Sequence, residues 1–124
     1  MPRKVRPPKW LPNVEKHDFE AAASYLALIY PRARCKTLVA ALRAANVVQF
    51  RAKDIFRASQ LSLLGISNLH VDKDRSQIDK REALSPLLLV RDEKNGKVVV
   101  ADGYHRLCAV YQVDEDAWIP CKIV

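Results

Sequence analysis

The chain has 124 residues, of which 49% are hydrophobic and 28% are charged, and its formal net charge is +7. A chain of this length can bury one core but is too short for two ordinary domains. No apolar run approaches the roughly 20 residues that a membrane helix needs, and the charges of residues 1–9 are not followed by the apolar stretch of a secretory signal. We therefore expect one cytoplasmic domain without a membrane partner.

The positive charge is concentrated at the N-terminus. Arg3, Lys4, Arg6 and Lys9 occur there without an acidic residue among them, which leaves the rest of the chain near +3. The sequence predicts a basic, proline-rich tail over residues 1–14. Such a tail either attracts nucleic-acid phosphates nonspecifically, through release of counterions, or is an ordinary solvated start.

Cysteine usage indicates neither a disulfide framework nor a metal site. Cys35, Cys108 and Cys121 are an odd set without the paired spacing of zinc ligands. We expect reduced, buried thiols and no metal bound by protein residues.

Two helices are expected first. Asp18 is a suitable N-cap for a helix over residues 19–30, which Pro31 ends, and a second apolar stripe predicts a helix over 34–46. With a connection of about three residues, these helices form a helical hairpin over residues 15–46.

The middle of the chain gives weaker signals. Residues 47–51 are typical of a short strand, and 52–64 could be helical. Gly65 and Asn68 indicate a loop. Residues 72–83 carry many charges and few apolar anchors, which fits an exposed helix or an ordered loop.

The C-terminal third predicts three strands and one helix: strands over residues 87–90, 97–101 and 119–124, and a helix over 105–112. Asn95-Gly96 is a strong hairpin signal between the first two strands. The strand–helix–strand run that follows favours a right-handed crossover with parallel pairing, and Pro120 favours an edge position for the last strand. The expected fold is α+β: a small mixed sheet with helices, formed by residues 47–124 within a single domain of 15–124.

One turn combines several features of a phosphate site. A buried strand ends at Asp102-Gly103, and His105 and Arg106 follow in the first turn of a helix. Glycine allows close backbone approach, the first helical amides lack intrahelical partners, and Arg106 could grip two phosphate oxygens. Alternatively, Asp102 is only a helix cap, and the two basic side chains face water.

Residues 86–124 resemble the ParB/sulfiredoxin superfamily, in which a proline-led apolar strand precedes a turn such as the Gly-Cys-His-Arg of sulfiredoxins. Here the turn reads Gly103-Tyr104-His105-Arg106. The resemblance implies a ParB/sulfiredoxin-like fold that binds a nucleotide or phosphate at this turn. Tyr104 replaces the sulfiredoxin cysteine, so reduction of sulfinic acids is not expected.

The resemblance also implies phosphate contacts from a basic, hydroxyl-bearing helix before the proline-led strand. Lys73, Ser76 and Lys80 have the corresponding spacing, although they also fit an ordinary solvated helix face. Tyr104 is expected to line the pocket and stack on a nucleobase, the alternative being that its ring packs on the sheet.

Three functions remain open. The first is binding of a nucleotide (ATP or CTP) or of nucleic-acid phosphate, in a DNA-associated setting of the ParB-like nuclease type. The second is an ATP-using small-molecule phosphotransferase, in which Asp102 positions magnesium or accepts a proton. The third is a non-catalytic protein-interaction module that uses the helical hairpin.

Overall fold

The structure is a computed structural model that describes residues 7–62 and 69–124. Its strands are β1 (Lys9–Trp10), β2 (Val48–Arg51), β3 (Ala83–Leu84), β4 (Leu87–Asp92), β5 (Lys97–Asp102) and β6 (Trp118–Ile123). Its helices are α1 (Lys16–Leu26), α2 (Arg32–Ala44), α3 (Ala52–Ser59), α4 (Leu69–Asp79) and α5 (Tyr104–Val113), with a short 3-10 turn at Glu93–Asn95. The fold is α+β, with one mixed four-stranded sheet and one two-stranded sheet.

The four-stranded sheet has the order β2-β6-β4-β5. β4 and β5 form the predicted antiparallel hairpin, and Gly96 in its turn has the left-handed φ of 63° that the Asn-Gly signal requires. The predicted parallel crossover through α5 is wrong: β6 does not lie beside β5 and runs in the opposite direction to it, pairing instead in parallel with β4 and antiparallel with β2. Because the tight hairpin holds β5 against one edge of β4, the chain returning from α5 adds to the other edge.

Pro120 lies in an interior strand rather than the predicted edge strand. β4 joins β6 only from Cys121 onward, whereas Pro120 is paired with Gln49 of β2. The missing N–H of Pro120 therefore falls where β6 has one neighbouring strand, which is why the residue is tolerated there.

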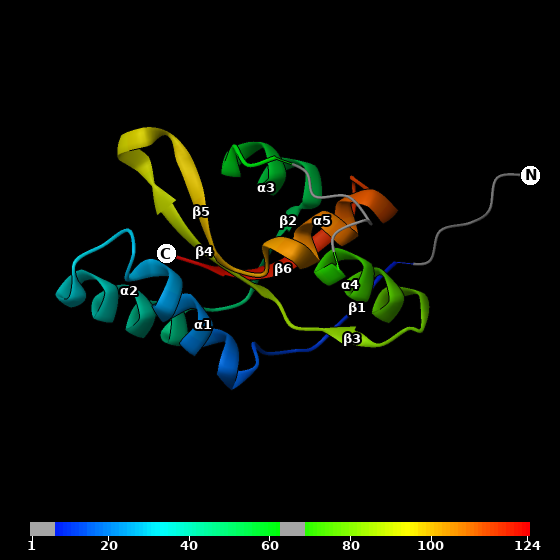
Figure 1. Ribbon diagram of the computed structural model, residues 1–124, viewed down its shortest axis with the longest axis horizontal. Helices are drawn as coiled ribbons and strands as arrows, with labels where there is room; N and C mark the ends of the chain where they lie inside the picture. The colour runs from blue at the N-terminus through cyan, green and yellow to red at the C-terminus, as the bar shows by residue number, and fades with distance from the viewer. Residues whose placement is uncertain (1–6, 63–68) are drawn as a thin grey trace, which may run out of the picture.

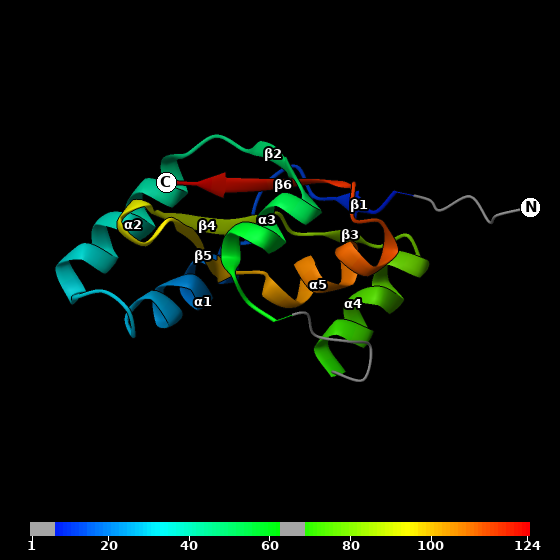
Figure 2. The same cartoon turned by 90° about the horizontal axis from the view of Figure 1, so that it is seen from above.

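Both faces of the sheet are covered by helices (Figures 1 and 2). Leu87 and Leu89 of β4 belong to the core under α3, α4 and α5, while Leu88 and Val90 belong to the core under α1 and α2. Alternate residues of a strand point to opposite faces, so a strand covered on both sides is apolar throughout. The uninterrupted apolar run Leu-Leu-Leu-Val at 87–90 is explained by helices that cover β4 on both faces.

The N-terminal helices differ from the prediction in their bounds. α1 begins at Lys16 and ends at Leu26, four residues before the predicted end, and five residues connect it to α2. The N-cap position belongs to Glu15, so Asp18 is not the N-cap: it lies in the first turn of α1 and is buried. Pro31 immediately precedes α2 as its N-cap residue instead of directly stopping α1.

Part of the predicted tail belongs to the folded body. β1 pairs in parallel with β3, and Trp10 packs against the main core. The described tail residues therefore include a strand, since Trp10 has an apolar ring to bury. Residues 1–6 and the loop predicted at Gly65 and Asn68 lie outside the described residues. Among the described helices, none is long and apolar enough to cross a membrane.

Candidate functional site

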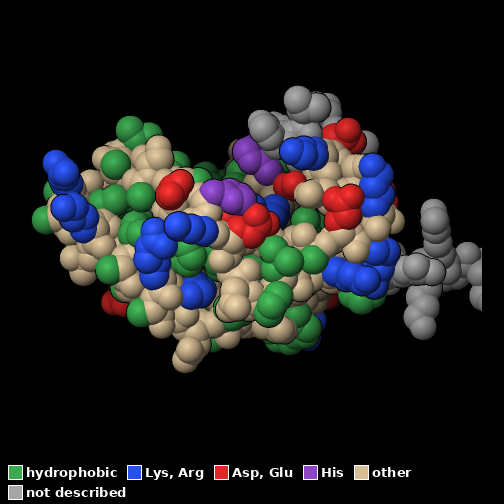
Figure 3. Space-filling view, turned by 90° about the horizontal axis from the view of Figure 1, so that it is seen from below, with side chains coloured by type: hydrophobic (Ala, Val, Ile, Leu, Met, Phe, Trp, Pro, Cys, Tyr) green, Lys and Arg blue, Asp and Glu red, His purple; other side chains and the backbone are tan. Residues whose placement is uncertain are grey.

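A polar pocket of about 300 Å³ lies where α1, α4, β3 and the start of α5 meet. We call it the α5 pocket. The space-filling view shows histidine, acidic and basic side chains gathered around a hollow on this face (Figure 3). Its described ionisable lining residues are Glu15, His17, Asp18, Lys73, Asp74, Asp102, His105 and Arg106. The structure thus brings together ionisable residues from three separate segments: the start of α1, α4, and the turn from β5 into α5.

Gly103 lines this pocket and begins α5. Its φ of 103° lies in the left-handed region, and it precedes the helix without a side-chain cap. A Cβ added to Gly103 would lie 2.8 Å from Leu87 Cγ and 2.9 Å from Arg106 Nη2. The space made by the glycine is therefore filled by the protein's own side chains, and the close approach predicted for a ligand is made by the Arg106 guanidinium.

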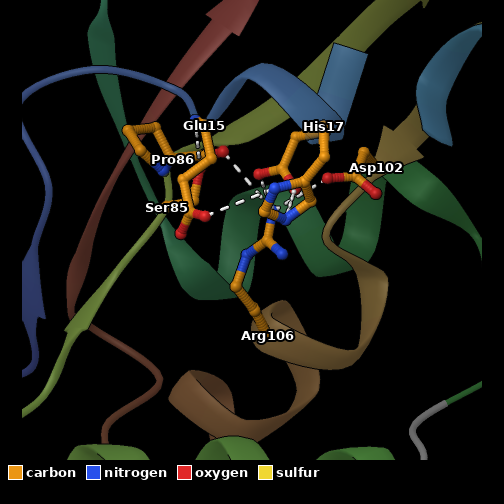
Figure 4. A network of polar contacts seen from close by, with 7 residues as sticks. Glu15, His17, Ser85, Pro86, Asp102 and Arg106 are labelled. Carbon is orange, nitrogen blue, oxygen red and sulfur yellow. Dashed lines mark hydrogen bonds and ion pairs between the residues drawn. The ribbon is translucent and has the colours of Figure 1, made fainter. Parts of the chain in front are cut away.

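Arg106 is held by carboxylates in this structure, which changes its predicted role (Figure 4). Its Nη2 donates to Asp102 Oδ2 at 3.1 Å and to Asp18 Oδ2 at 3.4 Å, and it also lies 3.5 Å from the carbonyl oxygen of Pro86. The Arg106 side chain is 17% exposed and that of Asp18 is 6% exposed. One nitrogen of the guanidinium expected to grip phosphate is thus engaged by the protein's own carboxylates, whereas Nε of Arg106 is buried without a hydrogen-bond partner among the described residues.

Asp102 lies at the pocket with its carboxylate beside that of Asp18. Burial raises the pKa of Asp102; Arg106 acts in the opposite direction, and the nearby Asp18 carboxylate adds to the increase. A carboxyl group whose pKa is raised keeps its proton to a higher pH than an exposed carboxyl group does. Asp102 is thus a partly buried acid in the lining of the pocket.

His17 adds an imidazole that the sequence reasoning did not single out. Its Nδ1 lies 3.4 Å from Glu15 Oε2, and its Nε2 lies 3.2 Å from Asp18 Oδ1. The Glu15 backbone N–H in turn donates to Ser85 Oγ at 3.0 Å. The first turn of α1 is thereby tied to the segment between β3 and β4 (Figure 4), and residues of both line the pocket.

Tyr104 is not among the residues that line the α5 pocket, contrary to the prediction. Its ring packs against the main core, and its hydroxyl oxygen is buried. Burial, with a further contribution from the neighbouring Cys108, raises the pKa of Tyr104 to about 12. The ring of Tyr104 is partly buried and packs against the core, which agrees better with the alternative of a packed ring than with a ring that lines the pocket.

Of the three helix residues proposed for phosphate contacts, one lines the pocket. Lys73 does so, together with Asp74 and Gln77 of the same helix. Ser76 and Lys80 are exposed and do not line it. Lys80 follows the end of α4 at Asp79, and Ser76 lies on another side of the helix; the predicted spacing of three and seven residues therefore does not follow the pocket-facing side.

The three cysteines are free and buried, as predicted. Burial raises the pKa of Cys121 to about 12, so this thiol is not a nucleophile at neutral pH. Among residues 7–62 and 69–124, no group of three or more His, Cys, Asp or Glu side chains is arranged to hold a metal ion.

Sequence reasoning missed the contribution of the first helix to this site. Asp18, Glu15 and His17 were available as an acidic and basic cluster, but an aspartate before an apolar stripe is also the usual sign of a helix cap. Only the packing of α1 against β5 places Asp18 beside Asp102, which is 84 residues away in the chain.

Taken together, the α5 pocket can hold a small polar molecule against a helix N-terminus, with a lysine and two imidazoles that can donate to an anion and a partly buried carboxyl group beside them. Comparison with known proteins adds no assignment, since no family model, curated protein or solved structure matches the chain.

Proposed function

We propose that this chain is a ParB/sulfiredoxin-like domain that binds a phosphate-bearing ligand, a nucleotide such as ATP or CTP, in the α5 pocket. The observation that carries the proposal is the opening of the α5 N-terminus onto a polar pocket lined by Lys73, His17 and His105. Helix N-termini favour anions through their amides and dipole. A lysine and two imidazoles supply further donors to phosphate oxygens.

Calorimetric titration with ATP, CTP and inorganic phosphate tests the proposal. Lys73→Ala should lower the affinity for the nucleotide about tenfold, the effect of losing one charge-assisted hydrogen bond. Lys80→Ala is the matched control, because Lys80 is exposed, follows the same helix and lies outside the pocket lining. The proposal is contradicted if wild type binds none of these ligands at millimolar concentration, or if the two substitutions have equal effects.

A phosphotransferase is the second candidate function, and Asp102 favours it. A general base needs a pKa shifted toward the working pH, and burial shifts that of Asp102 in this direction. Magnesium would then enter with the nucleotide phosphates. Consumption of ATP in the presence of small hydroxyl compounds, abolished in Asp102→Asn, would distinguish catalysis from binding alone.

The other two proposals concern different surfaces. Nonspecific contact with nucleic acid would use the basic tail. Deleting residues 1–8 should then reduce the slope of log affinity for DNA against log salt concentration by about 0.9 for each phosphate that the tail neutralises.

A protein-interaction role would use the end of α1 and the turn after it, where Tyr25, Leu28 and Ile29 are exposed. A Leu28→Ser variant that loses a partner while retaining nucleotide binding would support that role.

A further inference from the structure

The α5 pocket has an imbalance of charge that bears on how it could accept an anion. Of its described lining side chains, four are carboxylates, two are lysine or arginine, and two are imidazoles. The carboxylates therefore outnumber the permanent cations by two. A phosphate group that entered this pocket with both imidazoles neutral would meet an excess of negative charge, which opposes binding.

Arg106 does not relieve this imbalance. Its Nη2 is shared between Asp18 and Asp102, at 3.4 Å and 3.1 Å, and its side chain is only 17% exposed. Two carboxylates therefore already neutralise the positive charge of Arg106 in the absence of a ligand. Lys73 is the remaining permanent cation of the described lining, and the adjacent Asp74 of α4 lines the same pocket.

The imidazoles are the groups through which the pocket can change its charge. His17 lies between two carboxylates, with Nδ1 3.4 Å from Glu15 and Nε2 3.2 Å from Asp18. A neutral imidazole has one N–H and can donate to only one of them, whereas the protonated ring donates from both nitrogens and carries a positive charge. His105, in the first turn of α5, is the second imidazole of the lining. Protonation of these rings would reduce the excess of negative charge in the lining.

We propose that the α5 pocket takes up protons when it binds a phosphate-bearing ligand, and that His17 is the principal group that gains a proton. The inference rests on the proposed function and adds its regulation, since nucleotide affinity then increases as pH falls. Histidine is the side chain whose charge most readily changes within the physiological pH range, so the effect should be measurable there. The side chain of His17 is 71% exposed, so solvent protons reach it without any opening of the fold.

Calorimetry with ATP tests this inference when each titration is repeated at pH 7.5 in two buffers of different ionisation enthalpy, which counts the protons taken up. Wild type and His17→Gln are compared, because any proton gained by ATP itself is common to both. Proton uptake by wild type should exceed that of His17→Gln by about half a proton or more. Between pH 8 and pH 7, the affinity of wild type should also rise about 3- to 10-fold more than that of His17→Gln.

A second measurement does not depend on the substitution. The ring resonances of His17, followed by NMR across the pH range, should titrate with a midpoint at higher pH in the presence of ATP than in its absence. Binding of ATP with equal proton uptake in wild type and His17→Gln, or an unmoved midpoint, overturns the inference and leaves the proposed function intact. No binding of ATP by wild type anywhere between pH 5.5 and pH 8.5 overturns the proposed function, and this inference with it.

Discussion

Replacing Arg106 with methionine should unfold the protein at much lower denaturant concentration. Methionine keeps most of the length of the side chain but leaves Asp18 and Asp102 facing one another without the guanidinium that joins them. The Arg106 and Asp102 side chains are each 17% exposed, and that of Asp18 is 6% exposed. Removing one partner from a buried ion pair costs about 3–5 kcal/mol, which for a domain of this size lowers the melting temperature by about 10–20 °C.

The deficit of the Arg106→Met variant should shrink in acid. Two adjacent carboxylates without a cation hold a proton more tightly in the folded state than in the unfolded chain, so their folded pKa is raised. A raised folded pKa gives stability that is present at low pH and is lost as pH rises. Urea unfolding followed by circular dichroism should therefore show a smaller difference from wild type at about pH 5 than at about pH 7.

Arg57→Met is the matched control for this experiment. Arg57 also pairs with an aspartate, Asp54, but at 3.9 Å and with 87% of its side chain exposed. Exposed pairs contribute roughly 0–1 kcal/mol. If Arg106→Met changed the unfolding free energy by no more than Arg57→Met does, the buried three-residue network would not hold the pocket together as described.

Three further predictions concern the same turn. Asp102→Asn should gain stability relative to wild type as pH rises above about 4 in urea unfolding, because the raised folded pKa of Asp102 makes its contribution decline as pH passes from the unfolded to the folded pKa. Gly103→Ala should cost about 2 kcal/mol more than Gly96→Ala, since both glycines have positive φ but only Gly103 would press a Cβ against Leu87; equal thermal stability of the two variants would contradict this. Tyr104→Cys should cost about 3 kcal/mol without changing the ATP affinity of the folded protein, because the partly buried ring packs against the core; undiminished stability with weaker binding would show that Tyr104 contacts the ligand.

Local signals in the sequence predicted the elements around the candidate site. The β4–β5 hairpin follows from Asn95-Gly96 between two apolar runs, and the start of α5 follows from Gly103 after a buried strand. These features depend on short-range backbone chemistry, and the structure has them with bounds that differ by one or two residues.

Features set by distant packing could not be predicted in the same way. The pairing of β6 with β4 depends on which edge of β4 is free, and no residue of β6 encodes that choice by itself. The sequence around Asp18 fits either an N-cap or an ion pair with a distant residue. Only the packing of α1 against β5 places Asp18 beside Arg106 and so decides between these two roles. The spacing of Lys73, Ser76 and Lys80 is regular, but the rotation of α4 decides that Lys73 alone of the three lines the pocket.

Backbone amide chemical shifts, recorded during a titration of the full chain with ATP, test the central claim most directly. Binding in the α5 pocket should move the amides of residues 103–106 and of Lys73 most, while those of the exposed turn at Leu28 and Ile29 stay in place. Shifts confined to that turn, or no shifts at saturating nucleotide, would contradict the assignment of the pocket as a phosphate-binding site.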